Sequence, residues 1–186
     1  MKVKIGVSNR HIHLCQDDYE ILFGDNKLEK VKDLVQTGEF ASNLLVKIQT
    51  PKSTIEKVRV LGPIRKYTQV EISKTDCYSL GINPPIRTSG ELDDASEITI
   101  IGPNGVINKK CAIVANRHVH LNHNERIELG LENIDKISVK VGNEKTAILN
   151  DVYIKETPNG VLELHLDTDD ANANFLKTGD MAELIY

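Results

Sequence analysis

The most constraining feature of this chain is a short histidine motif that occurs twice. His11-Ile12-His13-Leu14 recurs as His118-Val119-His120-Leu121, at an offset of 107 residues, and each copy follows an Asn-Arg pair. Four of the six histidines of the chain lie in these two copies. In an extended strand, alternate side chains point to the same face, so each histidine pair can reach a single metal ion. This self-similarity predicts two related domains and two metal sites.

Strand signals outnumber helix signals along the chain. Segments rich in Val, Ile and Thr, separated by Gly and Pro turns, predict strands at residues 2–13, 43–50, 54–61, 68–73, 97–101, 106–116, 136–141, 145–149, 152–156 and 160–166. The predicted helices are short and lie at residues 16–23, 31–36, 75–80, 123–129 and 169–178. The expected fold is therefore mainly β, with two β-barrel domains related by the internal repeat and capped by short α-helices.

Length and charge exclude several classes of protein. The 186 residues fall short of the roughly 250 that an eight-stranded α/β barrel needs. With 23 Lys and Arg against 27 Asp and Glu, the net charge of −4 provides no overall attraction to nucleic acid or to anionic lipid. No apolar run approaches the roughly 20 residues of a membrane helix, and we expect no signal peptide before the first strand. We expect a cytoplasmic protein that binds neither nucleic acid nor membrane.

The three cysteines do not indicate a disulfide scaffold or a thiolate metal site. Cys15, Cys77 and Cys111 are odd in number and widely spaced, without a CxxC pair. Cys15 lies two residues after His13, so it is a conceivable ligand or nucleophile. Because Asp17 and Asp18 indicate that a helix starts there, we expect Cys15 to be a small buried apolar residue.

A histidine pair leaves a catalytic metal ion short of protein ligands, because such zinc sites usually have three. In residues 161–166, Glu163 and His165 alternate with leucines and therefore share the polar face of a strand. We expect His165 to complete a three-histidine set with His118 and His120.

The corresponding strand of the first half, residues 69–73, places Glu71 on the face opposite two apolar residues. Two histidines and a carboxylate form an established zinc arrangement. Glu71 is therefore the expected third ligand beside His11 and His13. The sixth histidine, His123, is expected to be a solvated or capping residue.

These patterns can also be explained by a structural role alone, without a metal ion. Duplicated barrels reuse core residues, so the repeated motif can be structural, and Arg10 and Arg117 can be buried partners of a domain interface. Arg65 follows a Gly-Pro turn six residues before Glu71. Its planar guanidinium beside a metal ion would suit phosphate, but Arg65 can equally be an exposed turn residue.

Several motifs together resemble the PduL-type phosphotransacylases, also called phosphate propanoyltransferases, over essentially the whole chain. The resemblance rests on Val7-Ser8-Asn9-Arg10-His11-Ile12-His13-Leu14, Arg59-Val60-Leu61-Gly62-Pro63-Ile64-Arg65, Thr68-Gln69-Val70-Glu71-Ile72-Ser73, Pro85-Ile86-Arg87-Thr88-Ser89-Gly90 and Asn116-Arg117-His118-Val119-His120. It implies one discontinuous barrel of residues 1–9 and 116–186, a second of residues 10–23 and 44–115, and a small insertion at 24–43.

The resemblance also implies roles for individual residues. A first metal site would comprise His11, His13 and Glu71, a second would comprise His118, His120 and His165, and Arg65 would bind phosphate. The metals would be two divalent ions, with Zn²⁺ favoured. Contacts to coenzyme A carry over to Ser8, Lys32, Arg59, Leu61, His165 and Asn172.

The reaction implied by the resemblance is phosphate acyl transfer. A short-chain acyl-CoA, propanoyl-CoA or acetyl-CoA, plus phosphate would interconvert with acyl phosphate plus coenzyme A by metal-assisted direct transfer. We expect no acyl-enzyme, because no Ser-His-Asp or Cys-His arrangement stands out. The alternatives are a non-catalytic metal-stapled binding module, a metal-dependent hydrolase, and a cupin-like oxygenase, for which Glu20 lies outside the usual spacing.

The resemblance also bears on assembly. The family tends to form homodimers, and members housed in bacterial microcompartments often carry an N-terminal encapsulation helix. Only Met1 and Lys2 precede the strand-like run that begins at Val3. We therefore expect this extension to be absent, with shell association left as an open alternative.

Overall fold

The computed structural model describes all residues from Met1 to Tyr186 and separates them into two compact units. Unit 1 contains Met1–Asn9 and Asn116–Tyr186, and unit 2 contains Arg10–Ala115. The chain therefore passes between the units twice, each time next to an Asn-Arg pair. The two units are described separately.

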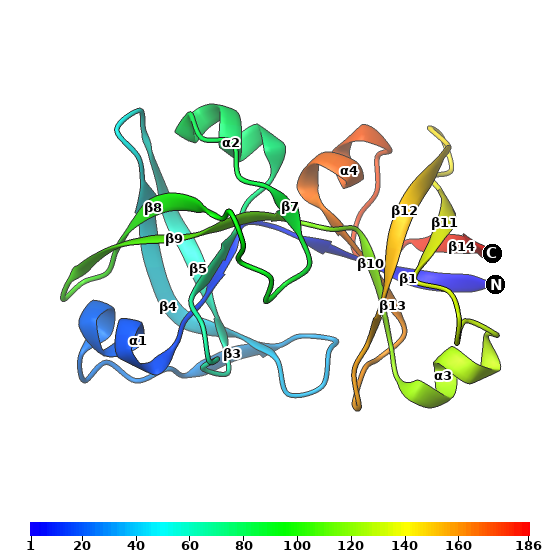
Figure 1. The fold of residues 1–186 in the computed structure, drawn as a ribbon, viewed down its shortest axis with the longest axis horizontal. Coiled ribbons are helices and arrows are strands. Elements are labelled where there is room, and N and C mark those ends of the chain that lie inside the picture. The colour runs from blue at the N-terminus through cyan, green and yellow to red at the C-terminus, as the bar shows by residue number, and fades with distance from the viewer. The chain divides into compact units, whose positions relative to one another are not determined.

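Unit 1 is a closed barrel of six strands (Figure 1). Around the barrel the order is β1 (Lys2–Ser8), β13 (Glu163–Asp167), β10 (His118–Leu121), β12 (Ala147–Glu156), β11 (Lys136–Val141) and β14 (Met181–Ile185). Two short helices, α3 (His123–Glu128) and α4 (Thr168–Ala173), lie outside the strands. Alternating apolar residues fill the interior; in β11, for example, Ile137, Val139 and Val141 are buried.

Unit 2 also closes a ring of six strands. The ring comprises β4 (Phe40–Gln49), β5 (Thr54–Gly62), β2 (His11–His13), β6 (Gln69–Glu71), β9 (Val106–Ala115) and β8 (Ser96–Ile101), and it closes because β8 pairs with β4. Two further strands, β3 (Lys30–Asp33) and β7 (Ile86–Arg87), pair with β4 and β9. Helices α1 (Gln16–Phe23) and α2 (Lys74–Leu80) lie outside the strands (Figure 1).

The two barrels share one plan of strand pairing. In unit 2, β2 pairs parallel with β5 and antiparallel with β6, and β6 pairs parallel with β9. In unit 1, β10 pairs parallel with β12 and antiparallel with β13, and β13 pairs parallel with β1. In this correspondence β1 of unit 1 is equivalent to β9 of unit 2. Along the chain, however, β1 directly precedes β2 of unit 2, and β9 directly precedes β10 of unit 1. Each repeat therefore contributes its first strand to the barrel of the other repeat.

The predicted fold class, mainly β with two barrels and short helices, is confirmed. Three details differ from the expectation. Residues 31–36 were expected to be helical, but residues 30–33 form the edge strand β3, and all four are exposed. Residues 2–13 are not one strand, because the chain changes units at Asn9 and Arg10. Residues 145–149 and 152–156 were expected to be two strands, but residues 147–156 form the single strand β12.

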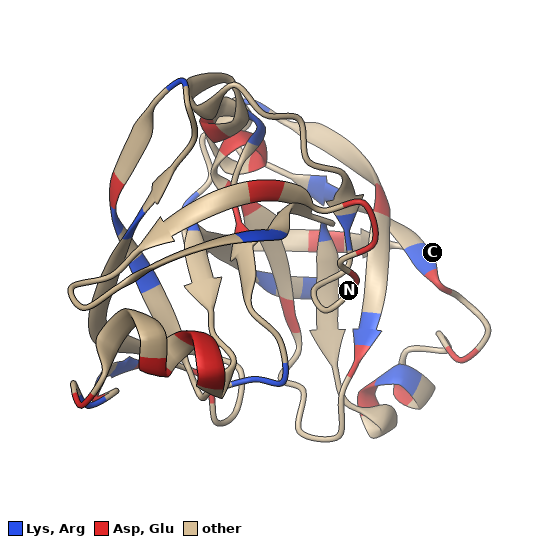
Figure 2. Cartoon of the chain, turned by 60° about the vertical axis from the view of Figure 1, so that its left-hand side comes forward, with Lys and Arg blue, Asp and Glu red and all other residues tan.

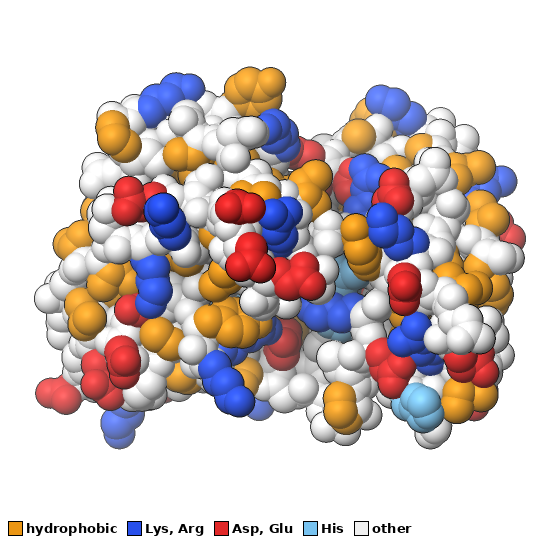
Figure 3. Space-filling model, viewed as in Figure 1, with side chains coloured by type: hydrophobic (Ala, Val, Ile, Leu, Met, Phe, Trp, Pro, Cys, Tyr) orange, Lys and Arg blue, Asp and Glu red, His pale blue; other side chains and the backbone are white.

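Charged residues of both signs are spread over the strands and helices (Figure 2) and mix with apolar side chains on the face shown in Figure 3. This distribution agrees with the small net charge of −4. None of the helices is long and apolar enough to cross a membrane.

One charge cluster, built around a buried carboxylate, ties α1 to the strands of unit 2. Asp18 on α1 is 7% exposed and accepts hydrogen bonds from the Thr68 hydroxyl and, at 2.6 Å, from Lys109 Nζ on β9. Burial disfavours the charged carboxylate, but the hydrogen bonds from Lys109 and Thr68 outweigh it and hold the pKa of Asp18 below its ordinary value.

We predict that this cluster contributes an acid-sensitive part of the stability. Because the pKa of Asp18 is lower in the folded chain, its contribution is complete above the unfolded-state pKa of about 3.9 and is lost as the pH falls through the folded pKa. Asp18→Asn should lower the free energy of unfolding by about 1–3 kcal/mol at pH 7. In urea unfolding at pH 3, the difference in free energy of unfolding between this variant and the wild type should become smaller. Asp17→Asn, at the exposed neighbouring position, is the control; a gap for Asp18→Asn that is independent of pH would contradict the assignment.

Candidate functional site

In unit 2, the register of two short strands assembles the first predicted metal set. β2 and β6 are antiparallel, with His11 opposite Glu71 and His13 opposite Gln69. One ligand atom from each of His11, His13 and Glu71 lies within 4.8 Å of the other two. Both histidines are buried, the Glu71 side chain is 12% exposed, and His11 Nε2 lies 3.4 Å from Glu71 Oε2. Two imidazoles and a carboxylate thus converge on one point.

Gln69 fixes the carboxylate of Glu71. Its Nε2 donates to Glu71 Oε1 at 2.6 Å and to Ser89 Oγ at 2.8 Å, and its Oε1 accepts from the Gly90 amide at 2.7 Å. The amide of Gln69 is therefore held at both ends, and Glu71 Oε1 is occupied. Sequence reasoning did not single out Gln69 or Ser89, because their roles depend on a contact across 20 residues.

Arg65 belongs to the same hydrogen-bond network. Its Nη1 donates to Ser89 Oγ and to the Tyr67 hydroxyl, both at 3.2 Å, and its Nη2 donates to Glu39 Oε1 at 2.7 Å. The Arg65 amide donates to the Leu14 carbonyl at 2.8 Å, which ties the segment to the residue after the histidine motif. Arg65 is therefore a partly buried guanidinium, 19% exposed, linked to Glu71 through Ser89 and Gln69, and not an exposed turn residue.

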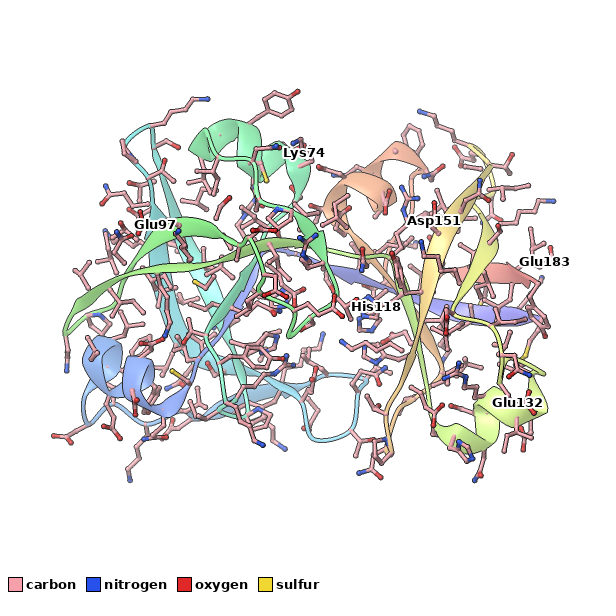
Figure 4. The ribbon with its side chains drawn as sticks, in the orientation of Figure 1. Lys74, Glu97, His118, Glu132, Asp151 and Glu183 are labelled. Carbon is pink, nitrogen blue, oxygen red and sulfur yellow. The ribbon has the colours of Figure 1, made fainter.

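In unit 1, the equivalent strands bring together the second predicted set. β10 and β13 are antiparallel, with His118 opposite His165 and His120 opposite Glu163. The three ring centroids lie 4.5–5.1 Å apart, and His118 Nε2 faces His120 Nε2 at 3.1 Å. Figure 4 labels His118, whose ring extends from β10.

Both donor sets fit a divalent metal ion. His118 Nδ1 lies 2.8 Å from the Asn116 carbonyl oxygen, which can only accept, so this ring nitrogen carries the hydrogen and Nε2 keeps its lone pair. Such a contact behind an imidazole is typical of metal ligands. The buried Nδ1 atoms of His13 and His120, which are equivalent positions, make no hydrogen bond, although both rings make other contacts. Three nitrogen or oxygen donors are the usual protein ligands of a catalytic zinc ion.

The repeated arginine ties each histidine strand to a helix of its own unit. Arg10 Nε donates to Asp76 Oδ1 at 2.9 Å, and Arg117 Nε donates to Asp170 Oδ2 at 2.6 Å. Hydrogen bonding to these carboxylates raises the pKa of both arginines. Each arginine therefore has an ion-pair partner within its own unit.

The two aspartates are equivalent positions that sequence reasoning missed. Asp76 follows Glu71 by five residues and Asp170 follows His165 by five, and each is the third residue of its helix. This repeated spacing was visible in the sequence and could have identified them as partners.

The residues predicted to contact coenzyme A are divided between the units. Unit 2 holds exposed Lys32 on β3 and, on β5, partly buried Leu61 and Arg59, whose Nη1 donates to the Ser42 carbonyl at 2.8 Å. Unit 1 holds partly buried Ser8 at the end of β1, His165 on β13 and exposed Asn172 on α4.

The three cysteines are all free, and they differ in burial. Cys77 and Cys111 are buried, and burial raises the pKa of Cys111 to about 12, so this thiol stays neutral. Cys15, expected to be buried, is partly buried, and its sulfur lies 3.4 Å from the Thr68 hydroxyl.

Comparison with known proteins identifies the family. Residues 4–177 match the family model of phosphate propanoyltransferase. Proteins named phosphate propanoyltransferase are 46% identical in Thermotoga maritima (97% of this chain, 88% of the relative), 43% in Rhodopseudomonas palustris (98% and 82%) and 45% in Priestia megaterium (96% and 83%). The chain therefore belongs to the phosphate propanoyltransferase family, whose members are phosphate acyltransferase enzymes.

Proposed function

We propose that this enzyme interconverts a short-chain acyl-CoA, propanoyl-CoA or acetyl-CoA, and phosphate with the acyl phosphate and free coenzyme A. The observation that carries the proposal is the network in unit 2 from Arg65 through Ser89 and Gln69 to Glu71. It joins a cation suited to phosphate with a donor set suited to a metal ion. The names of the related proteins support the same reaction class.

In this proposal, Arg65 binds the phosphate substrate. Its guanidinium already bridges the carboxylate of Glu39 and the hydroxyls of Ser89 and Tyr67, so several polar groups surround the place where an oxyanion would bind. A guanidinium fork matches two phosphate oxygens. Held in this way, phosphate is oriented for attack, which reduces the entropy cost of bringing it to the thioester.

The donor sets supply the remaining chemistry. A divalent ion, with Zn²⁺ favoured, held by His11, His13 and Glu71 would stabilise negative charge on the coenzyme A sulfur as a Lewis acid. His118, His120 and His165 would hold a second ion. Gln69 keeps the Glu71 carboxylate in position through its 2.6 Å hydrogen bond. Coenzyme A contacts are assigned to Lys32, Arg59 and Leu61 in unit 2 and to Ser8, His165 and Asn172 in unit 1.

The proposed transfer is direct. A phosphate oxygen attacks the thioester carbonyl carbon, the carbon–sulfur bond breaks, and the released thiolate takes up the proton that HPO₄²⁻ carried. No covalent acyl-enzyme is needed, which agrees with the neutral, buried thiol of Cys111.

We predict thiol release from acyl-CoA that depends on phosphate. The purified protein should release thiol from acetyl-, propionyl- and butyryl-CoA only when phosphate is present, and elemental analysis should find about two divalent ions per chain, one for each donor set. Equal thiol release without phosphate would instead identify a metal-dependent hydrolase. A protein that binds metal and releases no thiol would support the non-catalytic binding module.

We predict that the two donor sets lose metal independently. His11→Ala and His118→Ala should each remove about one ion per chain and most of the phosphate-dependent activity, because two ligands hold a divalent ion far more weakly than three. His123→Ala is the matched control, since the His123 side chain is 70% exposed and contacts Glu156. Full activity of metal-stripped wild-type protein would contradict the assignment.

We predict that Arg65→Lys weakens phosphate use selectively. Loss of hydrogen bonds to a charged ligand, about 1.5–3 kcal/mol, should raise the KM for phosphate about 10- to 150-fold and leave the KM for acyl-CoA nearly unchanged. Lys66→Ala, which removes the exposed neighbouring cation, should have no such effect. An equal rise in both KM values would argue for a structural role of Arg65.

A further inference from the structure

A buried carboxylate lies beside the second donor set and is not one of its three predicted ligands. Glu163 on β13 is 4% exposed, and its Oε2 lies 2.6 Å from His165 Nε2. Glu163 and His165 are two residues apart on one strand, so both side chains lie on the same face. A carboxylate this deeply buried needs a partner, and its side chain is hydrogen-bonded to the imidazole of a predicted metal ligand.

The neighbouring strand makes room for this carboxylate. Gly6 on β1 lies opposite His165 in the parallel pairing of β1 with β13. A Cβ atom at position 6 would lie only 2.9–3.1 Å from the carboxylate carbon and oxygens of Glu163. The strands run side by side in the barrel of unit 1 (Figure 1), so Glu163 lies over a position without a side chain.

The contact decides which nitrogen of His165 is available to a ligand. A carboxylate only accepts hydrogen bonds, so His165 Nε2 carries the hydrogen and Nδ1 keeps its lone pair. His118 is arranged in the opposite sense, because its Nδ1 contacts the Asn116 carbonyl and its Nε2 faces His120. The two imidazoles are thus held in different tautomers by different partners.

The first donor set has an equivalent pair of hydrogen-bonded side chains, but the donor and the acceptor have exchanged positions. Gln69 occupies the position in unit 2 that Glu163 occupies in unit 1, since Gln69 lies opposite His13 and Glu163 lies opposite His120. In unit 2 the amide donates to the carboxylate of Glu71, and in unit 1 the carboxylate accepts from the imidazole of His165. Each pair combines one donor and one acceptor; the carboxylate belongs to the first donor set in unit 2 and lies beside the second donor set in unit 1.

From these observations, we propose that Glu163 is a positioning residue of the second metal set, which orients His165 to bind a divalent ion through Nδ1, and that Gly6 provides the space it occupies. The inference rests on the proposed metal site of unit 1. Carboxylates behind metal-binding imidazoles fix the ring and raise its basicity, and their loss typically costs 10- to 100-fold in metal affinity.

The proposal can be tested without an activity assay. The measurement is Zn²⁺ affinity in a His11→Ala background, in which only the second donor set remains complete. In competition with a chromophoric chelator, Glu163→Ala should weaken Zn²⁺ binding about 10- to 100-fold. Glu163→Gln should recover most of the loss, because its amide oxygen still accepts from His165 Nε2. Glu183→Gln, at an exposed glutamate of the same barrel, is the matched control. Thermal unfolding followed by circular dichroism identifies any variant that fails to fold.

The tautomer of His165 provides a second, independent readout. Nitrogen–proton correlation spectra should place the hydrogen on Nε2 in the zinc-free and zinc-bound protein, and Glu163→Ala should remove this preference. Gly6→Ala, in which Glu163 remains but is displaced, should weaken Zn²⁺ binding in the same direction as Glu163→Ala.

Four results would overturn the proposal. Unchanged affinity in Glu163→Ala, or a hydrogen on Nδ1 of His165, would exclude the positioning role alone. A Glu163→Gln protein as weak as Glu163→Ala would indicate that the carboxylate itself is a ligand. A His11→Ala protein that binds no Zn²⁺ would remove the second metal site of the proposed function, and this inference with it.

Discussion

Both donor sets depend on one antiparallel register, that between the strand with the histidine pair and the strand with the third ligand. His11 lies opposite Glu71, and His118 lies opposite His165. A slip of one residue would turn the third ligand to the other face of the sheet and separate it from the two histidines. Closure of each barrel and the ties from Arg10 to Asp76 and from Arg117 to Asp170 hold this register, because they anchor both strands at their ends.

Duplication produced two equivalent backbones with different chemistry. The pairing directions around the two rings agree strand by strand, and each repeat contributes its first strand to the other barrel. Within this common frame, the first donor set includes a carboxylate, Glu71, whereas the carboxylate beside the second set, Glu163, lies two residues before the third ligand, His165. The same backbone can therefore present a harder oxygen donor in one unit and three imidazoles in the other.

Arg65 follows a turn, yet its guanidinium is partly buried. The guanidinium is compensated by Glu39 and bridged to Glu71 by Ser89 and Gln69. Glu39, Arg65 and Ser89 come from separate loops, and their meeting point depends on the pairing of β2 with both β5 and β6. A partly buried cation with an internal counter-ion has already lost part of its hydration. Exchange of that carboxylate for another oxyanion therefore costs less free energy than the transfer of a hydrated cation out of water.

The sequence by itself determined the features that depend on local periodicity. Alternation along a strand identified the histidine pairs, Glu71 and His165 as neighbours on polar faces, and the offset of 107 residues indicated a duplicated β-barrel. Local patterns failed at residues 31–36, where an exposed edge strand obtains its hydrogen bonds from β4 and lacks an apolar face.

Only the tertiary structure decided which distant residues meet. The partners Asp76 and Asp170, the network through Ser89, the exchange of first strands and the space that Gly6 leaves for Glu163 all depend on strand pairs formed between segments far apart in the chain. Periodicity specifies the face on which a side chain lies. Register and barrel closure specify what lies opposite, because they are set by the packing of the whole barrel.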